Sequence, residues 1–453
     1  MKLSATIFCL AALATGIARA RTPSASESES RVPLPAQLDL ASAVRYALDH
    51  NYAILQAREQ IRQQEGVIVQ VRAQEIPNVL GTGGYQRNAA AVSQSSLPET
   101  SLWTVEVKAT QALFAGGGID ASVKGAKLTR DAALYNLQAT INAALLDVRT
   151  RFYSVLLARE QVRVQEENIK LFQRELQDAQ NQFHAGSVSN FEVLRAQVSL
   201  ANAQPDLISA RNNLRISIEQ LRQSLGVPSG PAGIAVPFPE VVGTLDVSPQ
   251  PYSLEAALGS ALANRPELLQ LGKQKDAGEQ SVRAAKSTYY PNLSAFGGYE
   301  WGGLNAVGTA ALPGGYYGAN GWVIGLQSSW AIFDGRATAG RVQQARSLLN
   351  QAELSYASAE LAVDVEVRQA YSALQDAAEL VAASQKTIEQ AVEALRLAHE
   401  RYHAGSATQL DELTSQVALT QARTNQLQAN YNYLVAVAAL RKAIGLGDAQ
   451  VGN

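Results

Sequence analysis

The chain carries two very long stretches in which apolar residues recur every three or four positions. These stretches are residues 119–184 and 337–403, and they contain 66 and 67 residues. In the first, the apolar stripe is formed by Val155, Val162, Ile169, Phe172, Leu176, Ala179 and Phe183. This spacing gives an α-helix one apolar face, and at 1.5 Å per residue each helix would be about 100 Å long. The pattern therefore predicts two long helices that pack as coiled coils.

Shorter helical segments precede and follow each long one. They cover residues 40–75 and 190–225 in the first half, and 254–287 and 409–444 in the second. No short segment could cover a long helix, but the two in each half together have 72 and 70 residues. We therefore predict that two short helices stack end to end against each long helix.

Alternating apolar and polar residues mark strands between the first short helix and the long helix of each half. The alternation is clearest over residues 103–113 and 322–332 and weaker over 79–87 and 293–301. About ten alternating residues with aromatic side chains near the ends are typical of a membrane strand. The pattern predicts strand hairpins at 77–114 and 291–333, and an ordinary soluble hairpin is the alternative reading.

The two halves are copies of one unit. Residues 183–198 and 402–417 are identical at seven of sixteen positions, at an offset of 219 residues. We predict a first repeat over 38–226, a linker over 227–251 and a second repeat over 252–446. Residues 447–453 form a C-terminal tail.

The N-terminus has the features of a secretory signal. Residues 1–20 contain Lys2, an apolar stretch and the small-x-small sequence Ala18-Arg19-Ala20. Residues 21–37 are rich in Ser, Glu and Pro and predict a disordered segment. We therefore expect a signal peptide at 1–20 and an exported chain.

Composition excludes several classes of protein. The chain has 38 basic and 40 acidic residues, so binding to nucleic acid through a basic face has no support. The single cysteine, Cys9, lies inside the signal segment, which excludes disulfide scaffolds and thiolate sites from the mature chain. With four histidines in all, a catalytic histidine network is not expected, and we predict neither an enzyme nor a cofactor.

One motif nevertheless spells a metal site. His399-Glu-Arg-Tyr-His403 matches the His-Glu-x-x-His sequence of zinc peptidases. His399 also continues an apolar stripe from Leu395 to Tyr402, which favours a packed helix residue. The other copy has Gln180 where His399 stands. A zinc peptidase site at His399 and His403 is therefore only an alternative hypothesis, and no metal is predicted.

Four strands in one chain are too few to close a membrane barrel, for which about eight are the usual minimum. Closure therefore requires several chains. Three chains, as a homotrimer, would supply twelve strands and twelve helical columns.

At residues 402–411 and 183–192 the chain resembles the outer membrane factor family. The shared pattern is aromatic-x-x-Gly-x-x-x-x-x-acid-x-Leu, and the resemblance covers roughly residues 38–446. It implies a mainly α fold with a small β part. A trimeric 12-stranded outer-membrane β-barrel would be continued by a long periplasmic α-helical barrel, with two internal repeats per chain. It also implies a passive exit duct of a tripartite efflux pump or type I secretion system, embedded in outer-membrane lipid.

The resemblance implies partners and sites as well. The partners would be a periplasmic adaptor protein and an inner-membrane RND or ABC-type transporter. Asp411 and Glu192 would lie at the periplasmic gate, although each also suits the first turn of its helix. Ala407 and Thr414 depart from a familiar family member, which has Arg and Asp there. The adaptor-docking tips would be His184, Gly186, Ser187, Val188, His403, Gly405, Ser406 and Ala407. A soluble periplasmic coiled-coil scaffold is the alternative function.

Overall fold

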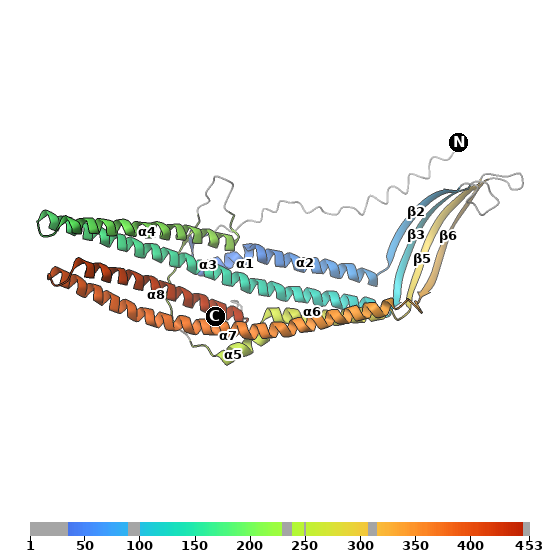
Figure 1. Cartoon of the computed structure of the whole chain (residues 1–453). Coiled ribbons are helices and arrows are strands. Elements are labelled where there is room, and N and C mark those ends of the chain that lie inside the picture. Colours follow the sequence, from blue (N-terminus) through green and yellow to red (C-terminus); the bar gives the residue numbers. More distant parts are fainter. Residues whose placement is uncertain (1–34, 89–99, 229–237, 249–250, 307–314, 447–453) are drawn as a thin grey trace, which may run out of the picture.

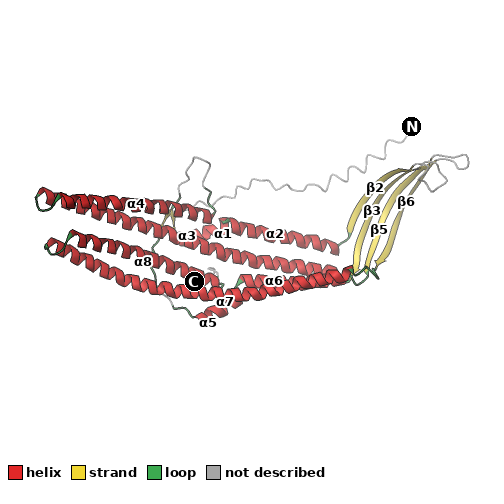
Figure 2. Cartoon of the chain, viewed as in Figure 1, coloured by secondary structure: helices red, strands yellow, loops and turns green. Residues whose placement is uncertain are grey.

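The protein is elongated, with its sheet at one end and two helical hairpins reaching to the other. The computed structural model describes residues 35–88, 100–228, 238–248, 251–306 and 315–446. Figure 1 shows the long strands together at one end, and Figure 2 shows that helices make up the rest of the length. The predicted signal peptide, residues 1–20, lies outside the described residues.

Eight α-helices and six strands are described. The helices are α1 (Leu40–His50), α2 (Tyr52–Arg72), α3 (Gly118–His184), α4 (Asn190–Leu225), α5 (Leu254–Asn264), α6 (Pro266–Ser287), α7 (Ala337–His403) and α8 (Gln409–Ala443). A 3₁₀ turn, Ala73–Glu75, follows α2. The strands are β1 (Gln37–Leu38), β2 (Asn78–Asn88), β3 (Thr100–Ala115), β4 (Glu240–Val241), β5 (Asn292–Ala306) and β6 (Gly315–Ser329). Among these described helices, none is both long and apolar enough to cross a membrane.

The leading helix of each half is broken, where the sequence predicts one continuous helix. Asn51 separates α1 from α2 because its backbone is extended and its side-chain oxygen accepts from the N–H of Ala53, 2.9 Å away. Arg265 separates α5 from α6 because it precedes Pro266, whose ring disfavours a helical residue before it. In both halves one residue with an extended backbone therefore marks the break.

The returning helix of each half ends against this break. The Asn51 amide donates to the carbonyl of Ser224, 2.7 Å away near the end of α4. Gly226 closes α4 with φ 75°, and a Cβ there would lie 2.3 Å from the His50 carbonyl oxygen. In the second half, a Cβ on Gly445 would lie 2.8 Å from the Asn264 carbonyl oxygen. Only glycine fits these left-handed, crowded positions.

Two apolar cores lie at these junctions, midway along the molecule. The first joins α1, α3 and α4, and includes Leu38, Phe152, Leu156, Leu221 and Leu225. The second joins α5, α6, α7 and α8, and includes Leu268, Val367, Leu374, Tyr433 and Leu440. Each long helix thus packs against the meeting point of two shorter ones, as the helix lengths predict.

The second junction also holds a buried ion network. The Arg265 side chain is 4% exposed and pairs with Glu267 and Glu366. Lys442 Nζ lies 2.8 Å from Glu366. Burial by itself would raise the pKa of Glu366, but the hydrogen bonds from Lys442 and Arg265 hold it below its usual value. These contacts tie α5, α6, α7 and α8 together.

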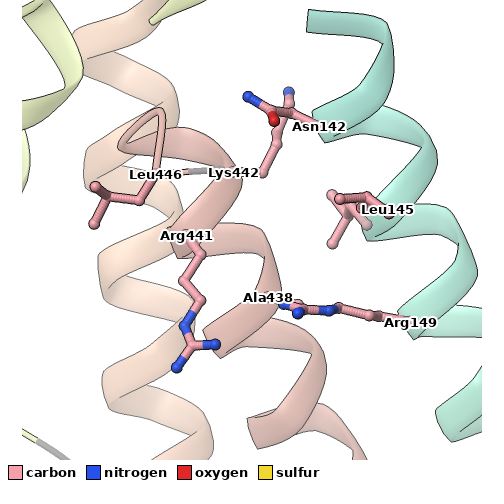
Figure 3. A pocket seen from close by; sticks show the side chains of 8 residues that line it. Asn142, Leu145, Arg149, Ala438, Arg441, Lys442 and Leu446 are labelled. Carbon is pink, nitrogen blue, oxygen red and sulfur yellow. The ribbon is translucent and has the colours of Figure 1, made fainter. Parts of the chain in front are cut away.

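Beside this network, a small basic hollow lies between α3 and α8. Asn142, Arg149, Arg441 and Lys442 line it, and Figure 3 shows how they lie around the end of α8. Its volume of about 20 Å³ has room for about one water molecule. It is too small to hold an organic ligand.

The larger sheet has four antiparallel strands in the order β2-β3-β5-β6. Tyr85 faces Trp103 across β2 and β3, and Tyr299 faces Trp322 across β5 and β6. β6 differs from the predicted 322–332 because it starts at Gly315 and ends at Ser329. Trp330 and the residues after it lead into α7 instead.

Part of the predicted linker and N-terminal segment is ordered in the fold. Gln37, expected in the disordered segment 21–37, belongs to β1, which pairs in parallel with β4. Val241 and Leu245, expected in the linker 227–251, are buried in the first core. This part of the predicted linker is ordered because its apolar side chains are buried in the first core.

The junction at Gly226 generates a prediction with a built-in control. Gly226→Ala should lower the free energy of unfolding by about 3 kcal/mol, because a strained left-handed alanine would also meet the His50 carbonyl. Gly186→Ala has nearly the same φ, 76°, but open space around it, so it should cost only about 1 kcal/mol. Denaturant unfolding in detergent measures both. Equal losses for the two variants would contradict the packing described here.

Candidate functional site at the hairpin tips

The two helical hairpins end in nearly identical turns, here called the tips, residues 185–189 and 404–408. The tips lie at the end of the molecule opposite the sheet (Figure 1). Gly186 and Gly405 adopt left-handed backbone angles, φ 76° and 71°. In the first tip the N–H of Ser187 donates to the carbonyl of Gln182 at 2.9 Å, and an equivalent bond of the same length closes the second. Glycine is favoured here because such a turn needs a left-handed residue.

Most of the predicted docking residues lie on the outer surface of the tips. His184, Gly186, Ser187, Gly405 and Ser406 are exposed, and Val188 and Ala407 are half-buried. His184 is the last residue of α3 and His403 the last of α7. The tips therefore present small side chains and open backbone at the end of the molecule.

Asp411 lies in the first turn of α8 and caps that helix. Its carboxylate accepts from the N–H of Thr408 at 2.8 Å and from the Thr408 hydroxyl at 2.7 Å. Thr408 accepts in return from the N–H of Asp411, which completes a capping box. The hydrogen bond from the Thr408 backbone, followed by that from its hydroxyl, lowers the pKa of Asp411. The carboxylate is therefore ionised and oriented by its own helix.

Glu192 holds the corresponding place in α4 but has a different environment. It lies 3.6 Å from Arg195, one turn along the same helix. Its Oε2 is buried without a hydrogen-bond partner among the described residues, and so is Nη2 of Arg195. Glu192 lies against Arg195 and Asp411 is bound to Thr408, so each carboxylate is oriented within its own hairpin.

Polar contacts, rather than a large apolar core, join the two hairpins near the tips. The Tyr402 hydroxyl donates to the Gln182 side chain at 3.4 Å, from α7 to α3. Farther along, Arg423 of α8 pairs with Glu167 of α3 at 3.0 Å. The buried apolar cluster nearest the tips is small and consists of Ala179, Val193 and Ala196. Contacts of this kind exchange readily with water, because each contributes little net free energy.

Glu175 of α3 is a half-buried carboxyl in this region. Burial is the main cause that raises its pKa, and repulsion by Glu412 and Asp178 adds to it, while Arg195 opposes the rise. The pKa of Glu175 is about 7, against 4.5 for an ordinary glutamate. At neutral pH the site therefore holds a carboxyl that gains and loses its proton readily.

The structure corrects the prediction for His399. The sequence places it in a packed apolar stripe, but its side chain is 54% exposed and its Nδ1 lies 2.6 Å from Glu412 Oε1 on α8. A polar partner on the neighbouring helix explains why a histidine stands in that position. Within the described ranges, no three His, Cys, Asp or Glu residues are placed to hold a metal ion.

Sequence reasoning missed Glu175 and Glu412 as members of this site. A signal for Glu175 was present, because it lies three residues after Phe172 and four before Ala179, inside the apolar stripe. An acidic residue at a stripe position indicates a buried or paired carboxyl. Glu412 has no such signal, because its partner His399 is thirteen residues away and on another helix.

Comparison with known proteins identifies the family. A sequence model described as "Outer membrane efflux protein" matches residues 43–227 and 257–446. The chain belongs to this family. The predictions of the family, of an outer-membrane location and of an exit-duct role are confirmed. The predicted mainly helical fold with a small sheet part also agrees with the structure.

Relatives match over most of their length. The outer membrane protein TolC of Vibrio cholerae is 23% identical over 407 residues, which is 90% of this chain and 90% of TolC. The cobalt-zinc-cadmium resistance protein CzcC of Cupriavidus metallidurans is 26% identical over 403 residues, 86% of each chain. The crystal structure of the outer membrane protein VceC from Vibrio cholerae matches with a TM-score of 0.73 and 17% identity, covering 90% of this chain and 96% of VceC. VceC and this chain share the fold.

The raised pKa of Glu175 predicts a pH-dependent stability. Between pH 4.5 and pH 7 the folded tip region is progressively destabilised, because Glu175 holds its proton more tightly when folded than when unfolded. Glu175→Gln should therefore raise the free energy of unfolding at pH 8 by about 1–2 kcal/mol, after allowance for solvent screening, and by nearly nothing below pH 5.

Hydrogen exchange of the tip amides, measured at both pH values, reports this local stability. Glu389→Gln is the control, because Glu389 is an exposed α7 carboxylate. A Glu175→Gln variant that exchanges like the wild type at pH 8 would contradict the assignment of a buried, proton-binding carboxyl.

Proposed function

We propose that three copies of this chain form one continuous exit duct, with strands in the outer membrane and helices in the periplasm. The observation that carries this proposal is the open sheet. In one chain β2 and β6 are the two edges of the β2-β3-β5-β6 sheet, so each leaves backbone N–H and C=O groups unpaired on one side. Lipid offers no hydrogen bonds, so an open edge is not tolerated in a membrane. Pairing β6 of one copy with β2 of the next, three times over, gives a closed barrel of twelve strands.

The helical part supports the same assembly. Large apolar side chains that are exposed in one chain gather on its two outer columns. On α7 they are Leu348, Leu354, Leu361, Val365, Leu380, Val392 and Leu397, and on α2 and α4 they are Tyr52, Val69, Phe191, Leu194, Val198, Ile208 and Ile216. Exposed apolar surface on this scale indicates an interface. We propose that α7 of one copy packs against α2 and α4 of the next, so that twelve columns form an α-helical barrel.

Two structural repeats per chain fit this design. The family model matches the chain twice, and both halves contain the same break, tip and glycine cap. Six repeats arranged around one axis would place every tip at the periplasmic entrance. We propose that the duct is passive, that it carries out no catalytic step and that it has no cofactor.

The proposed partners act at the two ends. Outer-membrane lipid surrounds the strands, and a periplasmic adaptor protein seats on the tips. Gly186, Ser187, Gly405 and Ser406 support this docking, because small exposed residues let a partner's backbone approach closely. The adaptor would connect the duct to an inner-membrane transporter of the RND or ABC type.

Asp411 and Glu192 are the proposed gate residues. Three Asp411 carboxylates around the axis would attract cations at the entrance. The capping box supports this role as well as a structural one, because it keeps the carboxylate ionised and fixes its direction. Glu192 is half-buried against Arg195, so we propose that it holds the tip and that Asp411 selects ions.

The assembly predicts a mass and a mutant phenotype. In detergent, light scattering should give a protein mass three times that of one processed chain. Leu361 is 72% exposed in a single chain, so Leu361→Glu should leave the chain folded but shift it towards monomers. Leu361→Met keeps the apolar contact and is the control. A monomer that forms pores by itself would contradict the proposal.

Docking predicts an export defect without an assembly defect. Gly405→Leu should abolish export in cells, because a bulky side chain at the tip blocks the adaptor, while the trimer forms normally. Gly335→Leu is the matched control, since Gly335 also has a positive φ, 64°, and open space, but lies beside the strands. Substrate export and trimer recovery from membranes are measured together. Export equal to wild type in Gly405→Leu would argue against docking at the tips.

If Asp411 selects ions, removing its charge should change the ion selectivity of the channel, whereas breaking the helix cap should not. Asp411→Asn should lower the cation preference of single channels in a bilayer and their block by divalent cations added on the periplasmic side. Thr408→Ala breaks the capping box but keeps the carboxylate, so its selectivity should stay near that of the wild type. If Asp411→Asn keeps the wild-type selectivity, Asp411 is only a helix-capping residue.

A further inference from the structure

An open hollow of about 410 Å³ lies between the end of α6 and the start of α7, next to the sheet. Lys286, Tyr289, Tyr290, Gln343 and Arg346 line it, together with two apolar residues. Tyr290 comes two residues before β5 begins, so the hollow lies where the helices meet the strands.

The polar groups of this hollow all suit an anion. None of the described residues that line it is acidic. Neither Lys286 nor Arg346 forms an ion pair with another described residue, whereas nearby Lys273 pairs with Asp276 and Arg341 with Asp334. An ammonium group, a guanidinium group and phenol hydroxyls are donors that bind phosphate oxygens. The hollow thus carries two positive charges with no protein partner among the described residues.

The strand next to the hollow indicates that it opens towards the membrane. Trp322, Ile324 and Leu326 alternate on one face of β6 and are 69–76% exposed. Trp330 continues the same alternation beyond the strand, and its indole N–H donates to the carbonyl of Tyr289 at 3.1 Å. Because Tyr289 lines the hollow, the hollow lies beside the apolar face that lipid would cover.

The side chains around the opening are typical of a membrane surface. Ile332 and Phe333 are 85% and 84% exposed, and Tyr289 and Tyr290 are more than half exposed. Apolar side chains that enter the acyl region, tyrosines at the headgroup level and cations just outside are the arrangement found at membrane interfaces. The surface therefore changes from apolar to positively charged within a few residues.

We infer that the hollow lined by Lys286, Tyr289, Tyr290 and Arg346 binds the phosphate of a phospholipid in the periplasmic leaflet of the outer membrane. The inference rests on the proposed position of the strands in that membrane. A bound phosphodiester would neutralise the two unpaired cations, and its acyl chains would lie along Trp330 and Ile332. Six such hollows are not implied, because Glu75 and Ile76 precede Pro77 in the first half where Tyr289 and Tyr290 precede Pro291 in the second.

The test compares lipid retention by variants of the intact protein. Native mass spectrometry of the detergent-solubilised protein, titrated with dioleoyl phosphatidylglycerol, measures the apparent dissociation constant. The double variant Lys286→Gln/Arg346→Gln should bind this lipid about tenfold more weakly or worse. The control Lys275→Gln/Arg368→Gln removes the same two charges from α6 and α7 farther from the strands, and it should bind within about twofold of the wild type.

Two further arms identify the source of the phosphate. Dioleoylglycerol, which has the same acyl chains without phosphate, should fail to compete with the phospholipid, and excess inorganic phosphate should displace little of it. Displacement by inorganic phosphate alone would overturn the lipid assignment in favour of a general anion site. Equal binding by the double variant and the control would overturn the site itself. The trimer mass and channel conductance of the wild-type protein test the proposed function separately.

Discussion

The whole structure depends on one length constraint: each long helix has 67 residues, and no helix that packs on it has more than 36. Two shorter helices must therefore meet beside the middle of each long one. Helix ends leave backbone groups without partners, so this meeting point would be costly unless those groups found other partners. Asn51 caps one helix and bonds the carbonyl of Ser224 near the end of another, and Gly226 lets the two ends approach. The two apolar cores lie at these points, so most of the stabilising apolar packing is in the middle of the molecule.

The two ends of the molecule meet different solvents and are built differently. At the sheet end, side chains such as Trp322 and Ile324 face outward, which is stable only where lipid or another chain covers them. At the tips, few apolar residues are buried, and hydrogen bonds or ion pairs such as Tyr402 with Gln182 join the hairpins. Polar contacts at an end surrounded by water can break at low cost, whereas the junction cores cannot.

The two tips have nearly the same backbone turn, but the acidic residue that follows each tip has different contacts. Asp411 and Glu192 occupy equivalent positions, yet Asp411 is exposed and bound to Thr408, while Glu192 is half-buried against Arg195. His399 and Glu412 pair within the second hairpin, and the charge of Glu412 also helps to raise the pKa of Glu175 on the first hairpin. The charged cluster near the tips therefore includes residues from both hairpins.

The sequence by itself determined the long helices, the strand hairpins and the tip turns, because these follow from periodicity and from glycines within a few residues. It also identified the family through the tip motif. It did not reveal the break at Asn51, the pairing of β1 with β4 or the His399–Glu412 contact. Each of these joins a residue to a partner on another element, and Asn51 and Ser224 are 173 residues apart. The local sequence pattern shows which face of a helix is apolar, but the tertiary structure decides which polar groups lie against that face. The pKa of about 7 for Glu175 depends on its burial and on the charge of Glu412 on another helix, so only the tertiary structure could show it.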